Sequence, residues 1–132
     1  MKVIFIEIGS DGGFDFKDLQ EKLEETRKQF PNTLMIGSFS AGSNLTGQYF
    51  DVDRIAYLCH LHGALAFFDY ACVGPYLAIN MSGETQLGFS RKWLDAEDQP
   101  RFERLCYKDA IFISPHKFVG GPGSSGILVM KA

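Results

Sequence analysis

Five polar side chains in this sequence could together support covalent chemistry on a carbonyl compound: Asn44, Asp69, Ser114, His116 and Lys117. A lysine amine that has lost its proton can form a Schiff base with a carbonyl group, and partial burial and nearby cations favour that loss. An acid can keep a ring nitrogen protonated, so that the ring accepts electrons from a substrate carbanion. These residues are distant in the sequence, so the fold must bring them together.

The segments between these residues predict alternating strands and helices. Apolar, often β-branched runs at 3–8, 33–39, 64–68, 110–113 and 127–130 are typical of strands. Asp15 and Asp51 are each expected to cap the start of a helix, and Asp18 stands where a capping-box acid would be. Gly63 stands where a helix C-terminal glycine belongs. Residues 80–107 are less regular, with a helix expected within 96–105.

Strands that alternate with helices indicate an α/β domain with a mostly parallel sheet. The strand at 64–68 is apolar throughout, which is typical of a strand covered on both faces. Only about a dozen residues separate 110–113 from 127–130, and a parallel crossover usually needs a helix. We therefore predict that the last strand is antiparallel and that the sheet is mixed.

The polar residues follow the predicted strands at their carboxyl ends. Asn44 comes after the second strand, Asp69 ends the third, and Ser114, His116 and Lys117 follow the fourth. Ligands of open α/β sheets bind beyond the carboxyl ends of the strands. A lysine and an acid at that edge match the needs of pyridoxal phosphate (PLP), which takes a Schiff-base lysine and an acid on its pyridine nitrogen.

Three motifs carry a resemblance to a known family. The segment SPHKFVGGPG, residues 114–123, resembles the lysine motif of the class V aminotransferase family, which includes cysteine desulfurases and selenocysteine lyases. SNLTG, residues 43–47, is similar to that family's Asn-containing loop, and HGALAFFDYA, residues 62–71, resembles its strand ending in the pyridine-binding acid. The motifs occur in the family's order, and the match runs from about Val3 to Met130.

The resemblance implies a role for each residue. Lys117 would form the Schiff base and move protons, Asp69 would pair with the pyridine nitrogen, and Asn44 would bind the ring hydroxyl. Ser114 and His116 would help to hold the phosphate. One position departs from the family, because Cys72 stands where desulfurases usually carry Gln. A thiol cannot donate to the ring hydroxyl as an amide does, which favours a less characterised branch.

The resemblance also implies that residues 1–132 are part of a fold type I PLP-binding large domain. The family's upstream strands, its phosphate-binding helix start, its ring-stacking residue and its C-terminal small domain are not among the matched segments. We therefore expect a fragment or truncated product whose parent, a homodimer, acts on an amino acid by transamination or by desulfurase or lyase chemistry. The isolated chain is expected to be inactive. The alternative is a non-catalytic interaction domain that retains the lysine motif.

Composition excludes other classes of function. The net charge of −3, with interleaved signs, does not favour nucleic acid. No apolar run approaches the ~20 residues that span a bilayer, and the N-terminal apolar segment is too short for a signal peptide, so we expect a cytoplasmic protein with no membrane partner. Three cysteines without a secretory signal predict free thiols. A zinc site from Cys59, His60, His62 and Cys106 is disfavoured, since Cys59 and His62 share a face that should be core.

Overall fold

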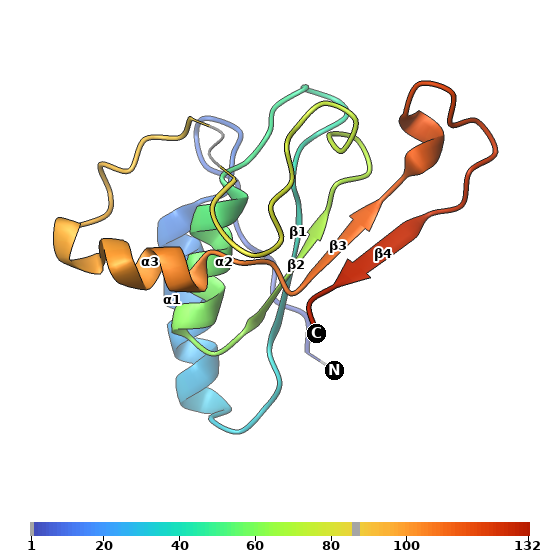
Figure 1. The fold of residues 1–132 in the computed structure, drawn as a ribbon. Coiled ribbons are helices and arrows are strands. Elements are labelled where there is room, and N and C mark those ends of the chain that lie inside the picture. The colour runs from blue at the N-terminus through green and yellow to red at the C-terminus, as the bar shows by residue number, and fades with distance from the viewer. Residues whose placement is uncertain (1, 86–87) are drawn as a thin grey trace.

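The computed structural model describes residues 2–85 and 88–132 and contains one mixed sheet (Figure 1). The strands are β1 (Ile36–Ser40), β2 (Leu65–Asp69), β3 (Ala110–Ile113) and β4 (Ile127–Met130), in the order β1-β2-β3-β4. β1, β2 and β3 are parallel, and β4 is antiparallel to β3. The predicted mixed sheet is confirmed. The helices are α1 (Phe16–Gln29), α2 (Val52–Leu61) and α3 (Gln99–Leu105), with the short 3-10 turns η1 (Ala96–Asp98) and η2 (Pro115–Lys117).

The helices lie on one side of the sheet (Figure 1). On that side Phe68 and Ala66 of β2 are completely buried, as are Ile55 and Cys59 of α2. The opposite face is only partly covered, and Phe112 there remains 42% exposed. The sequence prediction of a third strand buried on both faces is therefore wrong for one face, because no described segment packs across it.

Aspartate caps begin the two longer helices, as predicted. The carboxylate of Asp15 accepts hydrogen bonds from the backbone N–H groups of Lys17 (2.9 Å) and Asp18 (3.1 Å), and that of Asp51 accepts one from Arg54 (3.0 Å). Asp18 does not complete the expected capping box. Its carboxylate instead accepts the backbone N–H of Glu7 at 2.8 Å, which ties the N-terminal segment to α1.

The predicted strand at 3–8 is wrong. Only Ile8 forms a bridge, an isolated antiparallel one to Phe14, and Val3 and Phe5 are 62% and 82% exposed. The apolar pattern of this segment suits a strand, but a strand also needs a neighbouring strand to take its backbone hydrogen bonds. No described segment offers one, so the local pattern is not realised.

Arg27 joins the end of α1 to the end of α2. Its guanidinium donates hydrogen bonds to four backbone carbonyls, those of Pro31, Thr33, His62 and Gly63, at 2.9–3.0 Å. Gly63 has a φ of +69°, the left-handed conformation expected of a C-terminal glycine. The chain enters β2 directly after this clamp, so Arg27 helps to set where β2 begins.

Residues 80–107 contain the predicted helix, realised as η1 and α3, while 86–87 lie outside the described residues. The rest of this segment is tied to α2 by a buried ionic cluster. Lys108 is fully buried, and its ammonium contacts the carboxylate of Asp53, which also accepts hydrogen bonds from Thr85 and Arg91. This cluster anchors an otherwise irregular excursion to the helix layer.

Candidate functional site

The strand ends place the sequence-predicted residues at one edge of the sheet. Ser40 pairs with Asp69, and Asp69 pairs with Phe112, so β1, β2 and β3 end side by side. The loops that follow are joined directly: Ala41 donates its backbone N–H to the carbonyl of Asp69, and Tyr70 donates to that of Phe112, each at 2.8 Å. Asn44, Asp69 and Lys117 thus belong to three adjoining strand-end loops.

Glycines allow these loops to pack closely. A Cβ added at Gly42 would lie 2.5 Å from the side chain of Val73, and one at Gly74 would lie 2.8 Å from the carbonyl of Tyr70. A Cβ at Gly121 would collide with the carbonyl of Pro115, so the turn that carries Lys117 closes only with glycine there. The relative positions of the three loops therefore depend on contacts that no larger residue could make.

Lys117 ends the short turn η2. Its backbone N–H bonds the carbonyl of Ser114 at 3.0 Å, which fixes the turn, and its side chain is exposed. Ser114 is half-buried at the base of the turn, and His116 is exposed. In the described part of the chain, the amine of Lys117 makes no hydrogen bond or ion pair. The amine is therefore available to a ligand.

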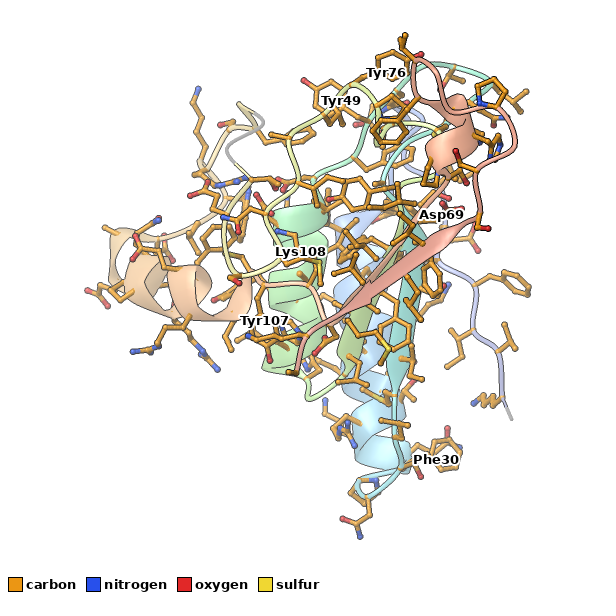
Figure 2. All side chains as sticks on the ribbon, turned by 45° about the vertical axis from the view of Figure 1, so that its right-hand side comes forward. Phe30, Tyr49, Asp69, Tyr76, Tyr107 and Lys108 are labelled. Atoms are coloured by element: carbon orange, nitrogen blue, oxygen red, sulfur yellow. The ribbon has the colours of Figure 1, made fainter. Side chains whose placement is uncertain are left out.

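Asp69 lies at the last position of β2, and its side chain is exposed (Figure 2). Its position alternates with the buried Phe68, so the carboxylate lies on the side of the sheet away from α2. One oxygen, Oδ1, accepts the backbone N–H of Ala71 at 2.7 Å. That bond holds the carboxylate in place, while Oδ2 has no partner among the described residues and can accept a proton donor.

Asn44 borders a shallow cavity of about 390 Å³ between the loops that follow β1 and β2. Its other walls include Tyr49, Val73 and Tyr76, which sequence analysis did not single out. Figure 2 shows Tyr49 and Tyr76 at the same end of the molecule. In the sequence, these residues stand out only as aromatic side chains in loops beside the motifs. Aromatic residues are common in packed loops, so they do not by themselves predict a cavity.

Cys72 connects the same two loops. Its thiol donates a hydrogen bond to the carbonyl of Gly42 at 3.0 Å. In this chain the residue at the position of the family's Gln therefore holds a loop instead of offering a donor to a ligand. The observation explains how a thiol is accommodated there.

The chemistry of these groups fits PLP. A carboxylate oxygen, an amine and an amide lie on adjoining loops, and no hydrogen bond or ion pair among the described residues joins any two of them. They are thus arranged around a common edge and not against one another. Gly120 and Gly123, in the loop that follows Lys117, have φ values of +79° and +86°, and a Cβ added at either would meet no atom within 4 Å, so this loop is open at both positions.

The four residues for which a zinc site was disfavoured do not belong to this edge. Cys59 is fully buried and Cys106 is too, while His60 binds the carbonyl of Leu105 (2.6 Å) and the carboxylate of Asp109 (2.8 Å). His62 is the C-cap of α2. No group of three or more potential metal ligands gathers within 2–85 and 88–132. The side chains of Cys59 and Cys106 therefore pack in the core, and that of His60 is held by hydrogen bonds.

Comparison with solved structures gives the fold. The chain matches a NifS-like protein from Rickettsia africae with a TM-score of 0.67 and 20% identity, over 95% of this chain and 28% of that one. It matches mouse CSAD with a TM-score of 0.63 and 20% identity, over 95% of this chain and 23% of that one. A serine palmitoyltransferase from S. paucimobilis with bound PLP matches with a TM-score of 0.50 and 14% identity, over 86% of this chain and 25% of that one.

The chain shares its α/β fold, with a mixed and mostly parallel sheet, with part of each of these fold type I structures. The fold implied by the class V aminotransferase resemblance is therefore confirmed. The chain spans about a quarter of the length of these structures. No protein-family model matches the sequence, and no curated protein matches it. Among the described residues, no helix is both long and apolar enough to cross a membrane.

Proposed function

We propose that this chain is the cofactor-binding part of a PLP-dependent enzyme that acts on an amino acid. The observation that carries the proposal is the presence of an amine, a carboxylate and an amide on three adjoining strand-end loops, each with unused hydrogen-bonding capacity. The fold shared with a PLP-bound serine palmitoyltransferase supports it. When bound, PLP supplies an electron sink for a carbanion of the amino acid.

Each side chain then has a defined task. Asp69, oriented by the Ala71 N–H, uses Oδ2 to accept the ring N–H and keeps the ring nitrogen protonated. Asn44 donates its amide to the ring hydroxyl. Ser114 and His116 would hold phosphate oxygens. The amine of Lys117 would condense with the aldehyde of PLP with loss of one water and, once the substrate amine has displaced it, would be free to move a proton at the substrate Cα.

The test measures attachment at Lys117. The chain is mixed with PLP, visible absorbance is recorded, and the complex is reduced with borohydride before peptide mass mapping. We expect a saturable absorbance band and label at Lys117, both lost in Lys117→Ala. Lys17→Ala is the matched control. Lys17 is an exposed lysine on α1, distant from Lys117 in the sequence, and among the described residues it pairs only with Glu21 at the surface.

Two outcomes would contradict the proposal: label spread evenly over the exposed lysines, or a Lys117→Ala chain with an unchanged absorbance band. Asp69→Asn refines the result. It keeps the bond from Ala71 possible but removes the charge that protonates the ring nitrogen, so we expect weaker PLP binding with attachment at Lys117 still detectable.

A non-catalytic binding domain is the second candidate, and the exposure of Asp69 and Lys117 favours it. Catalysis on a cofactor generally needs a site from which water is excluded. Turnover separates the candidates: the PLP-loaded protein is incubated with cysteine or alanine, and product formation is measured. Attachment at Lys117 without product from either amino acid would support the binding domain, whereas product from one of them identifies the reaction.

A further inference from the structure

A second cavity, of about 250 Å³, lies near the start of α2. It is bounded by the loop before α1, by residues 48–51, and by the described residues 89–93 that follow the buried ionic cluster. Half of its lining residues are aromatic, and most of the other half are polar or charged; the aromatic ones are Phe14, Phe16, Tyr49, Phe50, Phe89 and Trp93. The proposed PLP-binding residues are not part of it. A cavity of this size with aromatic residues in its walls suits a single-ring compound and is too small for a nucleotide or a polypeptide.

Arg54 is the cation of this cavity. Its guanidinium lies over the ring of Phe16, at 3.9 Å from the centroid, and over that of Trp93, at 4.5 Å. Contacts with ring faces do not consume the N–H donors of a guanidinium in hydrogen bonds. Among the described residues, no hydrogen bond or ion pair involves this side chain, and its Nε is buried without a partner.

The acids of the cavity wall, and Asp53 of the same helix, form no pair with Arg54 among the described residues. Asp51 pairs with Arg91 at 3.0 Å and accepts the backbone N–H of Arg54, and Asp53 contacts Lys108 and Thr85. Asp11, the other acid of the cavity wall, accepts the backbone N–H of Gly13 at 2.9 Å. No acid therefore forms a salt bridge with Arg54. A polar group left unpaired in a partly buried place is uncommon in folded proteins and calls for a partner.

Trp93 adds a second observation. Its indole Nε1 is also buried and has no hydrogen-bond partner in the described part of the chain. Both of these unpaired N–H donors lie beneath the cavity wall, so the donors of Arg54 that remain accessible to a ligand are its terminal nitrogens. A carboxylate suits the fork of a guanidinium because both of its oxygens can accept from one edge.

We propose that this cavity binds a small carboxylate with an aromatic body, whose carboxylate is held by the terminal nitrogens of Arg54. The ring packs against Phe14, Phe50 and Phe89. The site does not depend on PLP or on Lys117. Its ligand is held by charge and ring burial together, so either part alone binds more weakly.

Trp93 provides the assay, because it is the only tryptophan of the chain. Its fluorescence is titrated with 3-phenylpropionate, with propionate, which lacks the ring, and with 3-phenyl-1-propanol, which lacks the charge. We expect a saturable change with 3-phenylpropionate and an affinity at least about tenfold lower for each of the other two, as for the loss of one good contact. Equal affinities for the acid and the alcohol, or no saturable change, would overturn the proposal.

Variants test the role of Arg54. Arg54→Gln removes the charge and should weaken binding of 3-phenylpropionate at least about tenfold while leaving 3-phenyl-1-propanol unchanged. Arg101→Gln, at an exposed arginine on α3, is the matched control and should bind as the parent chain does. Unchanged affinity in a folded Arg54→Gln chain would refute the assignment. If that variant does not fold, Arg54→Lys retains the charge, and the acid-to-alcohol preference must then shrink because the fork is lost.

Discussion

Replacing Lys108 with methionine should destabilise this protein more than any change of an exposed lysine. Lys108 is fully buried, and its ammonium donates to Asp53 and to the carbonyls of Gly83 (2.8 Å) and Cys106 (3.0 Å). Methionine keeps most of the side-chain volume and removes all three donors. The buried carboxylate of Asp53 then loses one of its cations, and the carbonyls of Gly83 and Cys106 each lose a hydrogen-bond donor.

The size of the effect follows from what remains. Removing one partner of a buried ion pair lowers the free energy of unfolding by about 3–5 kcal/mol. Asp53 keeps the Thr85 N–H and hydroxyl, at 2.8 and 2.6 Å, and a longer contact with Arg91 at 3.5 Å, which compensate part of the loss. We therefore expect the lower end, about 3 kcal/mol, which lowers the melting temperature of a domain of this length by about 10 °C.

Urea denaturation followed by far-UV circular dichroism measures the free energy of unfolding. Lys28→Met is the control, because Lys28 makes only an exposed pair with Glu24 at 3.7 Å and should change stability by less than about 1 kcal/mol. The double variant Asp53→Asn/Lys108→Met should lose less than the sum of the two single changes, with a coupling of about 1–3 kcal/mol. A loss below about 1 kcal/mol for Lys108→Met, or strict additivity, would refute this reasoning.

Three further predictions concern other parts of the fold. Arg27→Lys cannot reach four carbonyls at once and should cost about 1–3 kcal/mol in the same denaturation assay, whereas Arg104→Lys on α3 should be neutral. Gly121→Ala should displace the turn of Lys117 and sharply lower its borohydride-trapped PLP label, while Gly83→Ala, where a Cβ would make only an ordinary contact at 3.6 Å, should keep that label. Burial raises the pKa of Cys59 to about 12 and that of Cys106 to about 11, so iodoacetamide at pH 8 should label Cys72 first in the folded chain. The reactivity of Cys59 should rise only as the pH approaches its pKa or when the chain unfolds. Rapid labelling of Cys59 at pH 8 would contradict its burial.

The elements that local chemistry determines could be predicted from the sequence. Asp15 and Asp51 cap helices because their carboxylates bond backbone N–H groups of the next turn, and Gly63 ends α2 because it adopts a positive φ. The antiparallel β4 followed from a connection too short for a crossover helix. The site residues were placed by the same logic, since each follows the end of a strand.

Features that depend on distant partners could not be predicted. The segment at 3–8 has a strand pattern but lacks a pairing strand among the described residues, and the unmatched upstream strands of the resembling family were the one sign of that. Lys108 reads as a surface lysine, because its partner Asp53 is 55 residues earlier in the chain. Arg54 likewise reads as an exposed helix residue until Phe16 and Trp93 come to lie beside it. In each case the deciding contact is formed only by the tertiary fold.

The order of the strands across the sheet is also their order along the chain. Among the four described strands, β2, β3 and β4 each pair with a strand that is synthesised earlier, and none of the four has to be inserted between two others that have already paired. Domains begin to fold from the N-terminal side during synthesis, so this sheet can grow in one direction by addition at a single edge. The hairpin of β3 and β4 is the most local pairing and comes last. The edge that carries Lys117 is then completed only after Asn44 and Asp69 are in place.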